Sequence, residues 1–347
     1  MVIYITILLL LFILGNTQNK YSESFFRLAC FSLAVILGFR DNNVGADTLR
    51  YAEYYSYASY NIGHMEPGWN MLIFLCKSIG LSSYGFNFFI AIITIICIAI
   101  PLEKVFVKSN TRSLALFCLV ALGFYFLMFN GMRQTTGIAI CFYAFYISSQ
   151  KKILWPTLLV LLASTLHTSC LLALPAVFVS RLPRLSLSTI LIAFTSSMII
   201  GLIATQNFYV TISGSYAYDV LGEGSFNSHP ILYFSTIVFL SNAFFLFLFL
   251  KTPKVLHDNY WFKLYFVALI IQGILFRLTY GQRIVYFYSF SAVVLFPILI
   301  TEFKRKKEIG LACYLYALVF FLRFLLQETP GAPGSLIPYT MTFKPFI

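Results

Sequence analysis

The chain has 347 residues, of which 60% are hydrophobic and only 10% are charged. Soluble domains carry about 25% charged residues and have too much surface to bury so large an apolar fraction. The composition therefore excludes a soluble globular protein and predicts an integral membrane protein. The net charge of +12 does not indicate nucleic-acid binding, because most basic residues lie in short loops between apolar segments, where they orient a membrane protein.

Apolar segments of roughly membrane-spanning length follow one another along the whole chain. They cover residues 1–15, 24–39, 85–102, 113–129, 134–150, 153–166, 168–180, 187–205, 230–250, 263–279, 284–300 and 309–326. The first lacks the basic start and the small-residue cleavage site of a signal peptide, so we interpret it as a span. The pattern predicts an all-α polytopic protein with about 12 transmembrane helices in one membrane domain, residues 1–347.

Basic residues predict the orientation. With both termini outside the cytoplasm, most of the 24 lysines and arginines fall in short inner loops. Two long outer segments result, residues 40–84 and 206–229. A short apolar stretch at residues 67–80 contains Lys77, and we interpret it as an interfacial or re-entrant helix. The basic residues left on the outer side are Arg40, Arg50, Lys77, Arg133, Arg277, Arg283, Arg323 and Lys344.

Arginine is over-represented in this outer set, on the side where positive charge is disfavoured. A guanidinium binds phosphate through a planar, bidentate and permanently charged group, so the set indicates an anionic headgroup, such as a pyrophosphate. The alternative is that these arginines reach phospholipid phosphates or pair with the nearby acidic residues. Those acidic residues are Asp41, Asp47, Glu53 and Glu66.

The segment FRDNNVGADTLRYAEYY at residues 39–55 places two carboxylates six residues apart, with Gly45 between them. This spacing indicates an ordered loop followed by a helix that starts at Thr48. Asp47 then has two interpretations. It caps the helix, or it acts as a general base toward a substrate hydroxyl or as a ligand of a divalent cation.

Two short turns resemble each other. FNGMRQTT at residues 129–136 has turn chemistry followed by Arg133 and Gln134 at a helix start, where an anion is favoured. YGQRIVYFY at residues 280–288 repeats the Gly–Arg arrangement with Arg283, and Arg277 lies one turn earlier in the preceding span. His167, in STLHTSC at residues 164–170, lies between two short apolar helices at the predicted outer face. It is either a satisfied turn residue or a general base or donor to a leaving phosphate.

Together these segments resemble the EpsG-like family of O-antigen and exopolysaccharide polymerases, the Wzy-type enzymes. The resemblance covers most of the chain. It rests on FRDNNVGADTLRY at 39–51, EPGW at 66–69, NGMRQ at 130–134, LHTS at 166–169 and IPY at 337–339.

The resemblance implies a GT-C-like fold in the bacterial inner membrane, with an active site facing the periplasm. It implies transfer of a growing glycan from undecaprenyl pyrophosphate onto a new lipid-linked repeat unit. Arg133 and Arg283 are expected to clamp the donor pyrophosphate, with Arg40 and Arg277 assisting. Either Asp47 or His167 is expected to accept the hydroxyl proton. The expected substrate-contacting or loop-shaping residues are Asp41, Glu66, Gln134, Tyr51 and Trp69; for the aromatic residues, a membrane-interface belt is the alternative.

The expected leaving group is already an activated pyrophosphate ester, so arginines can stabilise its charge and no cofactor or metal is predicted. A divalent cation at Asp41 and Asp47 remains open. The expected partners are the lipid-linked donor and acceptor, membrane lipids and, as an open possibility, a chain-length regulator protein. An O-antigen ligase or another polyprenyl-phosphate-dependent glycosyltransferase is the main alternative. A flippase or transporter is disfavoured, because mid-span positions are nearly free of charge.

Overall fold

The structure is a computed structural model that describes residues 1–18, 20–57, 65–203, 231–278, 281–302, 307–332 and 334–343. Helices account for 79% of it. Apart from an isolated antiparallel bridge between Arg40 and Met341, the described residues form helices and turns with no strand. The all-α prediction is therefore confirmed. The predicted outer loop at residues 206–229 lies outside the described residues.

The chain divides into two compact units, and each is described by itself. The first comprises Met1–Leu174 and Val293–Ile347, and the second comprises Pro175–Ala292. The α-helices of the first unit are α1 (Val2–Asn16), α2 (Ser22–Gly38), α3 (Thr48–Tyr57), α4 (Pro67–Ser78), α5 (Ser83–Val105), α6 (Ser109–Ala121), α7 (Phe124–Asn130), α8 (Met132–Ser149), α9 (Leu154–Ser164), α16 (Ala292–Glu302, from Val293) and α17 (Lys307–Gln327). The 3₁₀ helix η1 (Thr168–Arg181) leads into the second unit, which holds α10 (Leu187–Ile203), α13 (Ile231–Lys251), the 3₁₀ turn η2 (Leu256–Asp258), α14 (Tyr260–Leu275) and α15 (Gly281–Ser289).

Every predicted apolar segment coincides with helical structure, but the helices differ in their capacity to cross a membrane. By length and composition, α5 and α17 are long and apolar enough to span a bilayer. Within the described ranges, the count rises to four if the bent pairs α6–α7 and α15–α16 are each one span. Further apolar helices measure 10–17 residues over their described positions, whereas a straight span takes about 20. The helices fit a membrane-embedded protein, and the number of about 12 spans remains a prediction.

The break between α6 and α7 has a local cause. Gly123 has φ +84°, a left-handed conformation that a side chain would strain, and it interrupts the predicted span at residues 113–129. The two helices are bent by 55°. As a result α7 ends at Asn130, directly before the turn that leads into α8.

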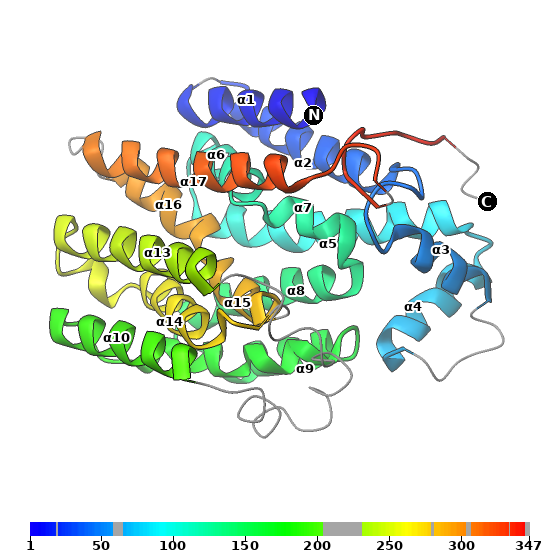
Figure 1. Cartoon of the computed structure of the whole chain (residues 1–347). Coiled ribbons are helices and arrows are strands. Elements are labelled where there is room, and N and C mark those ends of the chain that lie inside the picture. Colours follow the sequence, from blue (N-terminus) through cyan, green and yellow to red (C-terminus); the bar gives the residue numbers. More distant parts are fainter. Residues whose placement is uncertain are drawn as a thin grey trace. The chain divides into compact units, whose positions relative to one another are not determined.

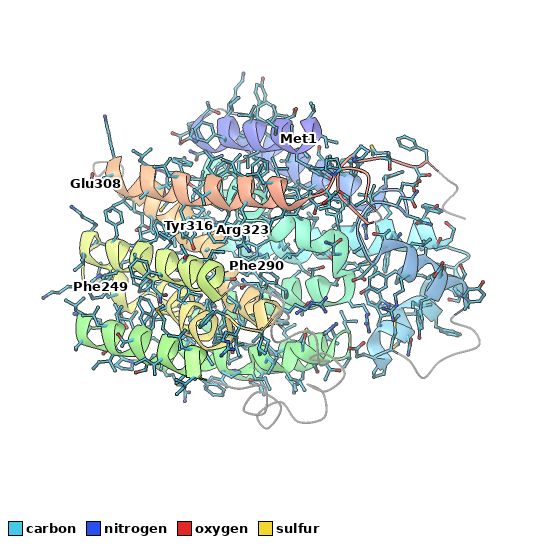
Figure 2. All side chains as sticks on the ribbon, in the orientation of Figure 1. Met1, Phe249, Phe290, Glu308, Tyr316 and Arg323 are labelled. Atoms are coloured by element: carbon cyan, nitrogen blue, oxygen red, sulfur yellow. The ribbon has the colours of Figure 1, made fainter. Side chains whose placement is uncertain are left out.

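In the first unit, α8 packs against α5 and α9, and α2 packs along α5. A buried aromatic cluster fixes α3 and α4 to the beginning of α5, where Figure 1 shows the three helices together. The Trp69 ring is fully buried and meets Phe86 edge-on at 5.4 Å between ring centroids. Tyr55 stacks on the same Phe86 at 4.9 Å. The predicted interfacial helix at residues 67–80 is therefore a helix held by its apolar face. In α17 of the same unit, Figure 2 labels Tyr316 and Arg323 among the side chains.

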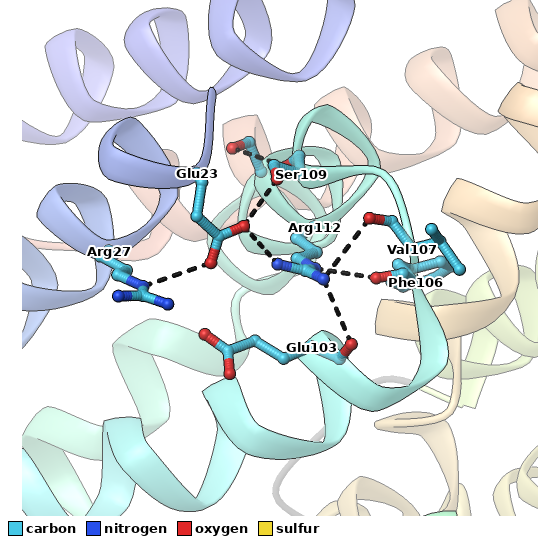
Figure 3. Close-up of polar contacts among 8 residues, drawn as sticks. Glu23, Arg27, Glu103, Phe106, Val107, Ser109 and Arg112 are labelled. Atoms are coloured by element: carbon cyan, nitrogen blue, oxygen red, sulfur yellow. Dashed lines mark hydrogen bonds and ion pairs between the residues drawn. The ribbon is translucent and has the colours of Figure 1, made fainter. Parts of the chain in front are cut away.

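An ion-pair cluster, formed by Glu23, Arg27, Ser109 and Arg112, joins the start of α2 to the start of α6 (Figure 3). Glu23 Oε2 accepts a hydrogen bond from Ser109 Oγ at 2.7 Å and pairs with Arg112. Arg112 also donates through Nε to the Phe106 carbonyl at 2.8 Å. The Arg112 guanidinium thus binds a carboxylate and backbone oxygens at the same time, which stabilises the connection between α5 and α6.

The second unit is built around α14, which packs against α10, α13 and α15. Asn259 caps α14, because its side chain accepts a hydrogen bond from the Trp261 amide at 2.9 Å. Phe245 of α13 packs on Phe262 and Phe266 of α14, with ring centroids 4.7 Å and 5.6 Å away. Lys263 is buried, yet its charge is satisfied by Asp258 and by the Leu182 carbonyl at 2.6 Å.

Candidate active site

The predicted loop before α3 is seated on the turn between α7 and α8. The Ala46 amide donates to Asn130 Oδ1 at 2.8 Å, and Thr48 Oγ1 donates to the Phe129 carbonyl at 3.3 Å. Gly45 has φ +94°, and a Cβ there would lie 2.4 Å from the Phe129 carbonyl oxygen. Only glycine fits so close to that backbone. The loop therefore depends on the residues immediately before Arg133.

Glu66 connects three segments that are far apart in sequence. It precedes Pro67, the first residue of α4. One carboxylate oxygen pairs with Arg133 Nη1, and the other accepts a hydrogen bond from the Thr168 amide at 3.1 Å. Nearby, the Gly68 amide donates to the Thr165 carbonyl at 2.8 Å. We call the group of Glu66, Arg133, His167 and Thr168 the loop junction.

The loop junction is shielded and charged. The side chains of Glu66 and Arg133 are only 16% and 22% exposed. Burial alone would raise the pKa of the Glu66 carboxyl. The backbone amides, Arg133 and His167 together lower it by more, so the pKa of Glu66 lies below the ordinary value. Glu66 is therefore a carboxylate at neutral pH. Arg133 thus pairs with an acidic residue, Glu66, which is the alternative given above for the outer arginines.

Arg133 also has a donor that the described residues do not use. Its Nε is buried without a hydrogen-bond partner. The guanidinium lies over the Tyr51 ring, 6.0 Å from the centroid, so α3 covers one side of it. A buried donor without a partner costs about 1–3 kcal/mol, and Arg40 Nη2 is a second donor of this kind. The predicted helix start is confirmed, because Arg133 and Gln134 lie in the first turn of α8.

His167 occupies the turn between α9 and η1, as the sequence predicted. Its Nδ1 accepts a hydrogen bond from the Ser169 amide at 3.3 Å and lies 2.7 Å from Ser169 Oγ. Because Nδ1 is an acceptor, the neutral ring carries its proton on Nε2. In this tautomer Nε2 of His167 is a hydrogen-bond donor rather than a base.

Asp47 stands at the predicted helix start, because α3 begins at Thr48. Its backbone carbonyl accepts the first helical hydrogen bond, from the Tyr51 amide at 3.0 Å, which is the position of an N-cap residue. Its carboxylate is partly exposed and belongs to the helical turn before Tyr51, the ring beneath Arg133. Both interpretations of Asp47, helix cap and general base, remain compatible with this position.

Arg40 and Asp41 stand at the start of the same loop, where Arg40 is buried and Asp41 is partly exposed. Arg40 is 1% exposed, donates through Nε to Thr48 Oγ1 at 3.0 Å, and also binds the Leu37 carbonyl. Burial lowers the pKa of Arg40 to about 10, so it remains a cation at neutral pH. Asp41 shapes the loop through Oδ1, which accepts from the Asn43 amide at 3.2 Å. In this structure Arg40 holds the loop and has no surface open to a substrate.

The tail segment IPY joins the same region. The Tyr339 hydroxyl donates to the Ile36 carbonyl at 2.7 Å, and the Asp41 amide donates to the Thr340 carbonyl at 3.0 Å. All five sequence segments that carry the family resemblance therefore meet in the first unit.

Tyr51, Trp69 and Gln134, which we expected to contact substrate, are mostly covered. Tyr51 is 9% exposed, Gln134 8% and Trp69 0%. The two aromatic rings pack on each other with centroids 5.9 Å apart. Trp69 therefore presents no ring face to a sugar in this structure and belongs to the core between α3, α4 and α5.

Arg277 and Arg283 lie in the second unit. Arg277 follows the end of α14 rather than lying within a span, and it donates to the Leu202 carbonyl at 3.1 Å. Helix α14 ends before the predicted boundary at residue 279. Arg283 is exposed in the first turn of α15, which confirms the second Gly–Arg helix start.

Two contacts of the candidate site were missed from the sequence. We interpreted Asn130 only as a turn residue, but its side chain holds the loop at Ala46. Thr168 was noted only as a neighbour of His167, but its backbone amide binds Glu66. A backbone amide donor cannot be recognised from the sequence, whereas an Asn in the turn before a helix can be recognised as a candidate hydrogen-bonding residue. Among the described residues, no three His, Cys, Asp or Glu side chains gather as they would around a metal ion.

The apolar helices of this all-helical fold fit a membrane-embedded protein, and the shielded arginine junction is a candidate anion-binding site. The profile described as the EpsG family matches residues 23–341, nearly the whole chain. The chain belongs to the EpsG family, whose members are similar to Wzy-type polymerases. No match was found among curated proteins or solved structures. The family suggests a polysaccharide-polymerase-like membrane protein with a glycosyltransferase-like role.

Proposed function

We propose that this protein polymerises a polysaccharide in the bacterial inner membrane, with its active site facing the periplasm. It transfers a growing glycan from undecaprenyl pyrophosphate to the hydroxyl of a new lipid-linked repeat unit. The acceptor oxygen bonds to the anomeric carbon, the bond to the pyrophosphate oxygen breaks, and undecaprenyl pyrophosphate leaves. The observation that carries the proposal is the loop junction, where a shielded Arg133 has a buried donor without a partner.

In this proposal Arg133 stabilises the negative charge that develops on the leaving pyrophosphate. Preorganised cations serve this purpose well in a shielded site, because they do not reorient during the reaction. Glu66 accepts a hydrogen bond from one N–H of the Arg133 guanidinium, so other N–H groups of Arg133 remain for phosphate oxygens. Glu66 is thus a positioning residue that orients Arg133 and the turn at Thr168.

The tautomer of His167 favours one of its two predicted roles. With its proton on Nε2, His167 donates a hydrogen bond to a phosphate or sugar oxygen. Asp47, which is partly exposed, is then the candidate base for the acceptor hydroxyl. In the second unit, the exposed position of Arg283 supports a contact with the anionic carrier, and Arg277 is proposed to assist it.

The test is the lipopolysaccharide banding pattern of a deletion strain. The strain is complemented with wild type, Arg133→Ala, His167→Ala, Asp47→Ala or Arg283→Ala. We expect lipid A core plus a single repeat unit in the deletion strain and a ladder restored only by wild type. Arg181→Ala, which changes an exposed arginine that is not a member of the loop junction, is the control and should restore the ladder.

Two other results would refute the proposal in different ways. Core without any repeat unit in the deletion strain would indicate ligation or flipping. A full ladder in the deletion strain would exclude polymerisation by this protein.

A further inference from the structure

An apolar groove runs between α2 and α5 in the first unit and has a volume of about 250 Å³. The small side chains of Ala34 and Ala99 leave the space, and Phe31 and Ile96 stand beside it, 59% and 49% exposed. The lining includes two charged side chains, Arg27 and Glu103. The groove is therefore apolar along most of its length and charged at one end, so it suits an amphiphilic ligand.

The dimensions of the groove match one leaflet of a bilayer. Along α5 its lining extends from Ile92 to Glu103, a rise of about 16 Å at 1.5 Å per residue. The hydrocarbon core of a bilayer is about 30 Å thick, so this length corresponds to the depth of one leaflet. Helix α5 is one of the two helices long and apolar enough to cross a membrane. A groove on its side is therefore open to lipid.

The charged end offers both an anion site and a cation site. Arg27 pairs with Glu23 at 3.2 Å, but both side chains are exposed, so the pair is weak. Glu23 has better partners in Arg112 and Ser109, which leaves Arg27 able to bind another anion. Within the described residues, the Glu103 carboxylate makes no hydrogen bond or ion pair, and Figure 3 shows no dashed line to it.

We propose that this groove binds one phospholipid with a phosphoethanolamine headgroup. One acyl chain lies along the apolar length, the phosphate binds Arg27, and the ammonium group binds Glu103. The charge pattern selects this headgroup, because a lipid with a phosphate and no ammonium would leave the Glu103 carboxylate beside a second negative charge. The inference is independent of the polymerase proposal, since neither residue belongs to the loop junction.

The test measures lipid bound to the full chain, purified in mild detergent and incubated with equimolar phosphatidylethanolamine and phosphatidylglycerol with identical acyl chains. Bound lipid is counted by native mass spectrometry. We expect wild type to retain phosphatidylethanolamine over phosphatidylglycerol by about tenfold, the ratio that one hydrogen bond to a charged group supports. Glu103→Gln, which keeps the side-chain shape, should lose this preference. Glu308→Gln, on exposed α17, should keep it.

A second variant tests the apolar length of the groove. Ala99→Leu fills the space and should reduce retention of both lipids. If that variant does not fold, the nearly isosteric Glu103→Gln still decides the question. Equal retention of the two lipids by wild type would overturn the proposal. An undiminished preference in folded Glu103→Gln, verified by gel filtration, would overturn it too.

Discussion

Two regions of the first unit both pair arginine with glutamate, but the pairs serve different purposes. In the loop junction, Arg133 and Glu66 are 22% and 16% exposed, and Arg133 keeps a buried donor without a partner. In the ion-pair cluster of α2 and α6, Arg112 is 13% exposed and donates to Glu23 and to several backbone carbonyls. Arg112 therefore supports the fold, whereas Arg133, which is only partly shielded and gives one of its N–H groups to Glu66, is the arginine proposed to bind a ligand.

The largest expected effect is on activity at the loop junction. Arg133→Ala should lower the polymerisation rate by about a hundredfold or more, because one preorganised donor to a developing anion is worth that factor. Arg133→Lys should recover little, because an ammonium group cannot replace the planar guanidinium. The rate is measured as glycan length against time in membranes with equal amounts of protein. Unchanged rates in both variants would remove Arg133 from the site.

Next in size is the close contact between α4 and the turn at Thr165. In Gly68→Ala the new Cβ would lie 2.2 Å from Thr165 Oγ1 and 2.8 Å from its carbonyl oxygen. We expect a loss of about 1–3 kcal/mol in the free energy of unfolding and a displaced Glu66. Gly310→Ala in α17 meets no atom within 4 Å and should be neutral or stabilising. Denaturation in detergent compares the two, and equal stabilities would contradict the packing described for α4.

Removing Arg112 should reduce stability and leave the chemistry intact. Arg112→Ala deletes the partner of Glu23 and of the Phe106 carbonyl, so we expect a loss of about 1–3 kcal/mol. Activity per folded molecule should be unchanged. Quantifying folded protein by fluorescence-detected gel filtration separates the two effects. A loss of specific activity as large as that of Arg133→Ala would erase the distinction between the regions.

Acidic pH should destabilise the loop junction, because it protonates the Glu66 carboxylate. Glu66 has a folded-state pKa below its ordinary value of 4.5, so its stabilising contribution is present above that value and is lost as the pH falls through the folded-state pKa. The melting temperature of wild type should therefore drop more between neutral pH and pH values below 4.5 than that of Glu66→Gln. Parallel pH profiles for the two proteins would show that the Glu66 carboxylate is not stabilised by its partners.

The smallest effect is expected for the exposed member of the ion-pair cluster. Arg27→Ala removes a pair in which the side chains are 71% and 40% exposed. Such surface pairs contribute about 0–1 kcal/mol, so the melting temperature in detergent should hardly change. A loss of stability as large as that of Arg112→Ala would mean that both arginines contribute to the packing of α2 against α6.

The amino-acid pattern predicted the helices well because hydropathy acts locally. The segments at residues 85–102 and 309–326 became α5 and α17. The helix start at Thr48 and those that place Arg133 and Arg283 in a first turn followed from short turn signals. The break at Gly123 was missed, because a single glycine in an apolar run does not reveal whether it adopts a left-handed conformation.

The candidate site was predictable in its residues but not in their partners. Glu66 was one of several acidic residues that the sequence offered to the arginines, and only the fold pairs it with Arg133. Trp69 was expected at a surface, but its neighbours Tyr51 and Phe86 come from other helices and enclose it. Arg40 was expected to touch a substrate because its charge suggested exposure, whereas the fold buries it against Thr48 and Phe129. Long-range contacts of this kind are set by tertiary packing, which no local pattern encodes.

In the proposed function, the loop junction of this EpsG-family protein is the site of glycan polymerisation. The most direct test uses purified protein in liposomes with undecaprenyl-pyrophosphate-linked repeat units and follows glycan length by electrophoresis. We predict that wild type and Arg112→Ala, compared at equal folded protein, extend the glycan, while Arg133→Ala and Glu66→Ala leave single repeat units. Extension by Arg133→Ala at the wild-type rate would contradict the claim.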